Sequence, residues 1–321
     1  MLNNLNLFAR RAFRFLKTGS TTNKEMREFF EFVKNSPHKY PTAFFNLTID
    51  FELAWSRARR GNISTTPEES LERARRAREM LPCLIELTKQ YNIPTTFAFV
   101  AHTALSDCAS HAKVPEFKPT WMESDWFSVD PNTSISENKN YYGIDLIKLV
   151  LDSGVEHEIA SHGFSHVDLG DADTTKEIAE YEIMESYRIL KLINNNLSTF
   201  IFPKNSPGFM ELLNRAGYTI YRGNKNSILK QDGFGLWYFP VGLWLSPLAS
   251  SSREINTAIS FAVQKKHLIN LWCHLYEFKN IEQLKDFFIP IFEFADKKRK
   301  EGSLEIETMQ SIVAKINNGQ R

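Results

Sequence analysis

Residues 42–52 read TAFFNLTIDFE, and this stretch decides the fold class. Its first part is a compact apolar run rich in Phe, Leu, Ile and Thr, which is typical of a buried β-strand. Two acidic residues, Asp50 and Glu52, close the run. Because alternate side chains of an extended segment point the same way, we expect both carboxylates to face one side of the strand end. A metal ion bound to one of them would relieve their mutual repulsion.

Similar apolar runs recur along the chain, and helical patterns separate them. A capping box, in which Thr66 precedes Pro67 and Glu69, predicts a long helix towards residue 91. The other expected strands are 93–100, 157–161, 198–202, 218–222, 236–245 and 267–274, further helices are expected to open near 173 and 206, and 56–66 and 102–140 are expected loops. This alternation predicts a parallel sheet covered by helices, in a closed or nearly closed barrel with its chemistry at the carboxyl ends of the strands.

Composition narrows the class of protein. The 321 residues are 42% hydrophobic, which suits one large domain or two modest ones. The net charge of +1 excludes the basic excess of a nucleic-acid-binding protein. Three cysteines, Cys83, Cys108 and Cys273, include no CxxC pair. This argues against a disulfide framework and favours a reducing compartment, so we expect a cytoplasmic protein.

Residues 2–17 combine apolar residues at helical spacing with interleaved Arg and Lys. A secretory signal would need an uninterrupted apolar stretch, and no run of 18 apolar residues predicts a transmembrane helix. Two interpretations stay open for this segment: a helix packed on the domain or used in assembly, and a basic amphipathic helix in peripheral contact with a membrane. The sequence makes no prediction of oligomeric state.

Two histidine-bearing segments follow predicted strands. SHGFSH (161–166) places His162 and His166 four positions apart with the flexible Gly163 between them, so both rings can reach one cation. LWCH (271–274) ends at His274, whose ordinary pKa near neutrality suits a general acid. Alone, each histidine is as well explained by a structural role. The segment HEIASH has one residue too many for HExxH, and the chain lacks GxSxG, P-loop and GxGxxG motifs, which disfavours zincins, serine hydrolases, NTPases and dinucleotide oxidoreductases.

TIDFE, SHGFSH and LWCH, in this order, resemble three motifs of the polysaccharide deacetylase family, also called the NodB homology or carbohydrate esterase family 4 enzymes. The resemblance spans roughly residues 43–276. It implies a distorted, TIM-like (β/α)7 barrel over residues 41–321, with residues 1–40 as an N-terminal helical extension. It also implies a divalent metal, by family habit zinc, on Glu52, His162 and His166, with Asp50 as catalytic base and His274 as general acid.

The remaining motifs depart from the family pattern. The segment after the fourth predicted strand reads Phe-Pro-Lys-Asn-Ser, so Lys204 stands where the family has an arginine that orients the base. Backbone N–H groups near Asn205 and Ser206 are expected to stabilise an oxyanion. Arg222 or Trp244 is expected to replace the missing fourth motif. Trp126, in the long loop, either anchors that loop or contacts substrate.

The resemblance implies a hydrolase that removes an N-acyl group, most simply N-acetyl, from a sugar. The expected substrate is a precursor such as a nucleotide- or lipid-linked sugar. Two alternatives stay open: a metal-independent cyclic-amide hydrolase of the same superfamily, and a non-catalytic glycan-binding barrel.

Overall fold

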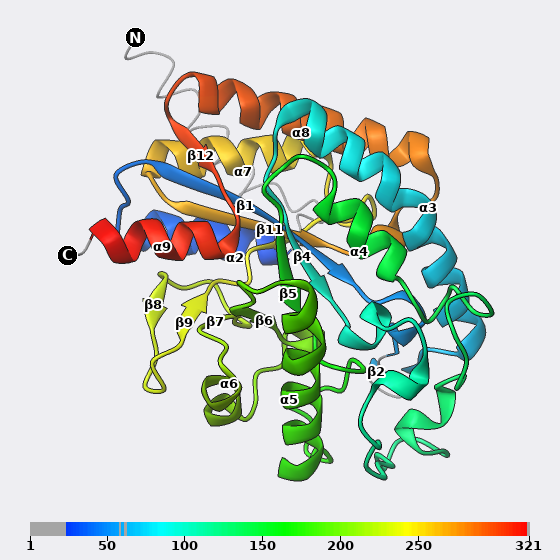
Figure 1. The fold of residues 1–321 in the computed structure, drawn as a ribbon. Helices are drawn as coiled ribbons and strands as arrows, with labels where there is room; N and C mark the ends of the chain where they lie inside the picture. Colours follow the sequence, from blue (N-terminus) through cyan, green and yellow to red (C-terminus); the bar gives the residue numbers. More distant parts are fainter. Residues whose placement is uncertain (1–23, 58, 61–62, 320–321) are drawn as a thin grey trace.

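A curled, mainly parallel β-sheet forms the centre of the computed structural model, which describes residues 24–57, 59–60 and 63–319 (Figure 1). Its strands follow the order β10-β11-β1-β4-β5-β6-β7-β9-β8, and β12 pairs with β1. The bounds are β1 Ala43–Phe51, β4 Thr96–Phe99, β5 Glu158–Ser161, β6 Thr199–Ile201, β7 Ile220–Arg222, β8 Lys230–Gln231, β9 Trp237–Phe239, β10 Leu243–Trp244, β11 Leu268–Cys273 and β12 Leu304–Ile306. The predicted distorted (β/α)7 barrel is confirmed.

The barrel closes through the chain between β9 and β10. Strand β9 pairs with β7, and β10, which begins after three intervening residues, pairs with β11 on the opposite side. The side-chain amide of Asn270 in β11 donates to the carbonyl oxygens of Pro240 and Val241, at 3.0 and 2.9 Å. The segment that contains β9 and β10 therefore occupies the seventh strand position of the barrel. Its first part, β9, pairs with β7, and its second part, β10, pairs with β11.

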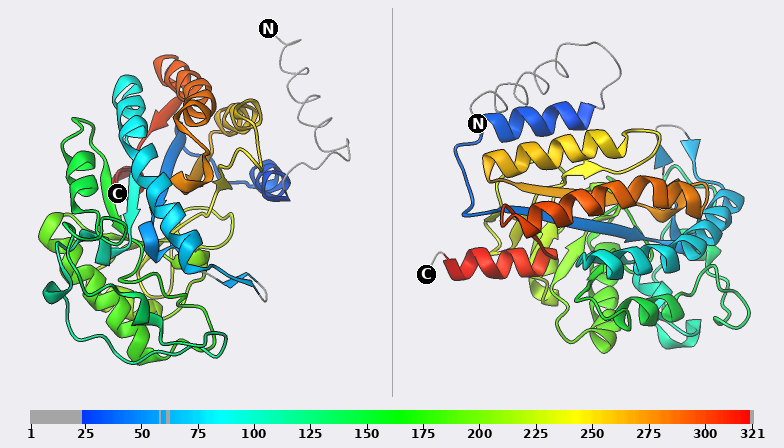
Figure 2. Two further views of the ribbon diagram at one scale, coloured as in Figure 1. Left: turned by 90° about the vertical axis from the view of Figure 1, so that its right-hand side faces the viewer. Right: turned by 90° about the horizontal axis from the view of Figure 1, so that it is seen from above.

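Helices cover the outside of this sheet, as the two further views show (Figure 2). Their bounds are α2 Lys24–Asn35, α3 Pro67–Tyr91, α4 Ile144–Leu151, α5 Lys176–Ile193, α6 Met210–Ala216, α7 Ser252–Lys265, α8 Ile281–Lys300 and α9 Met309–Gly319. Helix α2, the described part of the predicted N-terminal extension, packs on α7 through an edge-to-face contact of Phe30 with Phe261. The predicted amphipathic segment 2–17 lies outside the described residues. Among the described helices, none has the length and apolar character needed to span a bilayer.

Most element boundaries agree with the sequence, and the Thr66 capping box of α3 is confirmed. Three differ. The predicted loop 56–66 contains a short hairpin, β2 (Arg59–Arg60) with β3 (Ile63–Ser64). Helix α5 uses Thr175 as its N-cap, because Thr174 donates its hydroxyl to the carbonyl of Asp168 instead. Helix α6 begins at Met210 rather than near 206, because Phe209 has a left-handed backbone conformation, with φ of 56°, that a right-handed helix cannot contain.

The barrel interior is layered along its axis. At the end where β1 begins, Phe44 and Leu268 belong to an apolar cluster completed by Met309 and Ile312 of α9, which lies across that end of the sheet (Figure 1). Nearer the carboxyl ends of the strands, buried polar side chains form hydrogen bonds from strand to strand. They are Asn46, Thr48, Thr96, Glu158, Thr199 and Asn270. The candidate functional residues form the third layer, at the carboxyl ends of the strands.

Candidate active site

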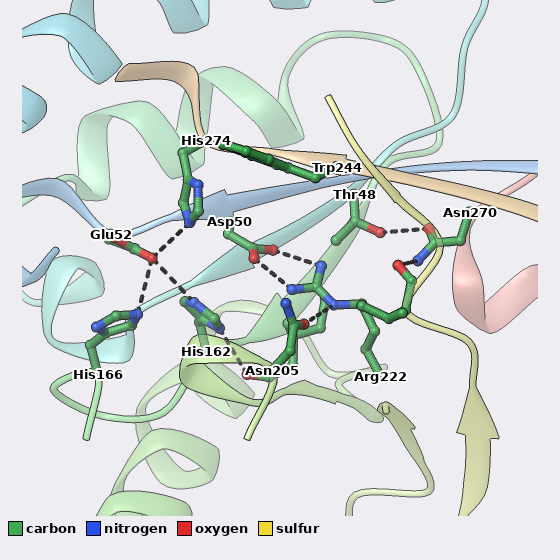
Figure 3. Close-up of polar contacts among 12 residues, drawn as sticks. Thr48, Asp50, Glu52, His162, His166, Asn205, Arg222, Trp244, Asn270 and His274 are labelled. Carbon is green, nitrogen blue, oxygen red and sulfur yellow. Dashed lines mark hydrogen bonds and ion pairs between the residues drawn. The ribbon is translucent and has the colours of Figure 1, made fainter. Parts of the chain in front are cut away.

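A cavity of about 330 Å³ opens at the carboxyl ends of the strands. The predicted motifs meet there, since Asp50 lies near the end of β1, Glu52 follows β1, His162 follows β5 and His274 follows β11. Figure 3 shows these side chains converging from their separate strands. The cavity is lined by Asp50, Glu52, Ser56, Thr65, Glu69, Arg73, His162, His166, Lys204, Asn205, Trp272, His274 and Tyr276.

Glu52, His162 and His166 present three ligand atoms to one point. The Glu52 Oε1 atom lies 3.5 Å from Nε2 of His162 and 3.0 Å from Nε2 of His166. The opposite nitrogens of the two rings are 2.8 Å from the carbonyl oxygen of Ile201 and 3.0 Å from that of Arg57. If each Nδ1 donates to its carbonyl, both Nε2 lone pairs face Glu52, which is the orientation that a metal-binding histidine needs. The donor set and its geometry therefore fit a divalent cation.

The turn that carries both histidines is shaped by Glu182 of α5. This buried carboxylate accepts hydrogen bonds from the backbone N–H groups of Phe164 and Ser165, each at 2.9 Å. A Cβ at Gly163, where φ is +77°, would approach the same carboxylate to 3.0 Å. His166 also has a positive φ of 69°, which is rare for a residue with a side chain. The ligand geometry is thus held by a buried carboxylate and a strained turn.

Asp50 forms a buried, two-pronged ion pair with Arg222. The guanidinium nitrogens lie 2.9 and 2.6 Å from the two carboxylate oxygens, and Nε of Arg222 donates to Asn205 at 2.9 Å (Figure 3). Lys204 instead pairs with Asp168 at 2.7 Å, so the prediction that Lys204 orients the base is wrong. The reason is the shape of the cation, because a planar guanidinium forms two parallel hydrogen bonds with a carboxylate and an ammonium cannot.

His274 lies between two carboxylates, those of Glu52 and Glu277. Its Nε2 lies 3.1 Å from Glu52 Oε1, and its Nδ1 lies 2.8 Å from Glu277. The indole N–H of Trp244 donates to the same Glu277 oxygen, at 2.8 Å. Trp244 therefore supports the site from outside the cavity, through Glu277.

Charge and burial act in opposite directions on these groups. Burial is the largest influence on Asp50 and disfavours its carboxylate, but Arg222, His162 and His274 together outweigh it and hold the pKa of Asp50 below its ordinary value. Burial likewise opposes ionisation of Glu52, yet the facing His166 and His274 hold its pKa well below its ordinary value. Burial lowers the pKa of His274, but Glu52 and Glu277 outweigh it and raise that pKa to about 10. The site favours ionised carboxylates, the form that binds cations.

The structure favours the first of the two roles predicted for Trp126, and the predicted oxyanion contacts are not made. Trp126 is buried and donates its indole N–H to the Ser165 hydroxyl at 2.9 Å, so it anchors the long loop and does not line the cavity. The backbone N–H groups of Asn205 and Ser206 donate to the carbonyls of Phe202 and Pro203, so neither is available to an oxyanion. Asn205 still reaches the cavity through its side chain, whereas Ser206 is not among the lining residues.

Sequence reasoning missed two supporting acids, Glu182 and Glu277. Glu277 lies three residues after His274, and this spacing could have indicated a partner for the ring. Glu182 is one of several acids on a long helix, and no local pattern distinguishes it.

No family model and no curated protein matches the sequence. Solved structures do match. One from Mycobacterium smegmatis, named as a polysaccharide deacetylase, has a TM-score of 0.59 at 14% identity and covers 89% of this chain and 94% of that one. Another of that name, from Pseudomonas aeruginosa PAO1, has a TM-score of 0.58 at 11% identity and covers 87% and 93%. PuuE allantoinase has a TM-score of 0.56 at 12% identity, with coverage of 87% and 93%. The fold class is therefore the barrel that these polysaccharide deacetylase and allantoinase structures share.

Proposed function

We propose that this protein is a metal-dependent hydrolase that removes an N-acyl group, most simply N-acetyl, from a sugar. One observation carries the proposal. Three cation ligands, an arginine-paired carboxylate and a histidine bound to a second carboxylate all face one cavity. The name carried by two of the similar structures agrees with this chemistry.

The cation would be held by Glu52, His162 and His166. Three protein ligands leave coordination positions for other molecules, which is typical of a catalytic rather than a structural site. When bound, a divalent cation polarises an acyl carbonyl and lowers the pKa of a water molecule. Imidazole together with one carboxylate suits zinc, which is our choice of metal.

Asp50 and His274 each carry out one of the two proton transfers of the reaction. Asp50, fixed by Arg222, accepts a proton from the water that adds to the acyl carbon. His274, oriented by Glu277, donates a proton to the nitrogen as the carbon–nitrogen bond breaks. The products are a free amino sugar and a carboxylic acid, so atoms and charge balance without a further reactant.

The cavity wall supports a sugar as the substrate. Trp272 and Tyr276 contribute partly exposed aromatic side chains to it, and the apolar surface of a sugar ring can pack against their edges. The Arg73 guanidinium lies over the Tyr276 ring at 5.1 Å and adds positive charge to the same wall. We extend the proposal to sugars linked to a phosphate, as in nucleotide- or lipid-linked precursors.

The test is acetate release from N-acetylated sugars, with metal content measured on the same samples. We expect His162→Ala to lose the cation at this site and to lower kcat/KM by about 10³-fold or more. His38→Ala, altered at the opposite end of the barrel, is the matched control and should behave as wild type. The metal-independent alternative predicts undiminished activity in His162→Ala and hydrolysis of cyclic amides such as allantoin. Metal binding without turnover of any N-acyl sugar would favour a glycan-binding barrel.

A further inference from the structure

A second group of potential metal ligands lies in the long loop between β4 and α4. His102 lies in the short turn three residues after the end of β4, Cys108 and His111 lie on the next turn, and Asp130 ends the turn that contains Trp126. Their ligand atoms all lie within 4.8 Å of one another. The His102 side chain is fully buried, and those of Asp130 and His111 are 6% and 9% exposed.

The spacing of these atoms matches a tetrahedral site. Nε2 of His102 and Nε2 of His111 lie 3.3 and 3.4 Å from Asp130 Oδ2, and Cys108 Sγ lies 3.7 Å from Nε2 of His102. Zinc bonds of about 2.0–2.1 Å to nitrogen or oxygen and about 2.3 Å to sulfur place tetrahedral ligands about 3.4 Å apart, and about 3.6 Å where one ligand is sulfur. These three separations agree with such edges. Cys108 Sγ also lies 2.7 Å from Asp130 Oδ1 and 2.7 Å from the Tyr142 hydroxyl, and both contacts would lengthen when the thiolate binds a cation.

His111 is oriented as a ligand. Its Nδ1 lies 2.7 Å from the carbonyl oxygen of Ala112, so this nitrogen can carry the ring proton. Its Nε2 is buried and faces the Asp130 carboxylate, with Oδ2 at 3.4 Å. With Nδ1 protonated against a carbonyl, Nε2 presents its lone pair beside a second potential ligand, which is how metal sites fix a histidine tautomer.

We propose that His102, Cys108, His111 and Asp130 bind a second divalent cation, of the zinc type, which has a structural role. One thiolate, two imidazoles and one carboxylate fill a tetrahedral shell from the protein alone, and a closed shell is typical of structural zinc. A sulfur ligand disfavours magnesium and calcium. This proposal is independent of the proposed catalytic function.

The second cation would stabilise the turn that carries His162 and His166, two of the proposed ligands of the first. The His102 and His111 rings contact Phe164, at centroid distances of 5.6 and 5.4 Å, and Phe164 lies between His162 and His166 in sequence. The backbone N–H of His102 also donates to the carbonyl of Phe164 at 3.0 Å. A cation joining His102 to Asp130 would hold the loop firmly behind that turn.

The thiolate makes the two sites distinguishable. The purified full-length protein is loaded with Co²⁺, and bound metal and near-ultraviolet absorption are measured. We expect two equivalents of metal and a sulfur-to-cobalt charge-transfer band in wild type. Cys108→Ser should lose the band and one equivalent, whereas His162→Ala should lose one equivalent and keep the band. Cys83→Ser, altered on the outer helix α3, is the control and should keep both equivalents and the band.

The wild-type sample alone decides the proposal if a variant does not fold. At most one equivalent of metal with no charge-transfer band would overturn it and would show a metal-free hydrogen-bonded cluster instead. A band that persists in Cys108→Ser would overturn it as well, because the sulfur ligand would then be another cysteine.

Discussion

Arg222 and Asp50 show how one buried pair sets both stability and chemistry. The Arg222 side chain is 0% exposed and that of Asp50 is 3% exposed, so each charge depends on the other for its solvation. Replacing one partner leaves an unpaired buried charge, which costs about 3–5 kcal/mol. The Lys204–Asp168 pair is more exposed, and pairs of that kind contribute about 0–1 kcal/mol.

We therefore expect Arg222→Gln to lower the free energy of unfolding by about 3–5 kcal/mol, and Lys204→Gln by less than about 1 kcal/mol. Chemical denaturation measures both. If Arg222 positions the base, Arg222→Lys should fold, keep KM within a few-fold and lower kcat by about 10²-fold. Equal effects of Arg222→Gln and Lys204→Gln on stability would contradict this assignment.

His157 gives the fold a defined response to acid. Burial lowers the pKa of His157 to about 4, and its Nδ1 accepts a hydrogen bond from the Thr95 N–H at 3.1 Å. In the unfolded chain the pKa returns to about 6.5. Between these values the unfolded chain takes up a proton that the folded protein does not, so stability falls as pH falls.

The expected slope is at most about 1.4 kcal/mol per pH unit from this residue. His157→Asn keeps an acceptor near the Thr95 N–H but does not titrate, so it should be less sensitive to pH between about 6.5 and 4. Urea unfolding at several pH values measures the difference. Identical pH dependence of the two proteins would show that His157 does not carry this effect.

At the scale of elements, barrel closure depends on the close packing of the β9–β10 segment against β11. A Cβ at Gly242 would lie 1.9 Å from the carbonyl oxygen of Asn270, and the φ of Gly242 is +77°. Gly235 has the same φ of +77° but nothing within 4 Å of its Cβ position. The two glycines therefore separate the cost of backbone conformation from the cost of close approach.

We expect Gly235→Ala to cost about 1–2 kcal/mol, from backbone conformation alone. Gly242→Ala should cost about 3 kcal/mol more, because the closing segment must move away from β11. Thermal and chemical unfolding of the two variants provide the comparison. Equal losses would show that the closing segment adjusts freely.

Sequence patterns predicted the helices and strands better than they predicted the contacts between them. Residues 42–52 predict β1 because a compact apolar run and its β-propensity are local, and the same holds for the Thr66 cap of α3. The pairing of Asp50 with Arg222 joins residues 172 positions apart, and no local pattern contains it. Closure through residues 240–242 likewise depends on a contact with Asn270 that only the assembled sheet creates.

At the scale of the whole molecule, seven strand positions deliver their carboxyl ends to one face, with β9 and β10 sharing the seventh. This topology explains why Glu52, His162 and His274 were recognisable separately, each as a polar residue just after an apolar run. It also explains why Glu182 and Glu277, the acids that support the site, were not recognisable from the sequence. Glu182 and Glu277 come from helical segments, where charged residues are usual and their inward direction is set by packing.

Anomalous diffraction at the zinc absorption edge, from crystals grown with zinc, would locate the cation directly. We expect a peak within about 2.0–2.2 Å of Glu52 Oε1 and of Nε2 of both His162 and His166. Crystals that contain zinc but show no peak among these three atoms would contradict the assignment of this cavity as a metal-dependent active site.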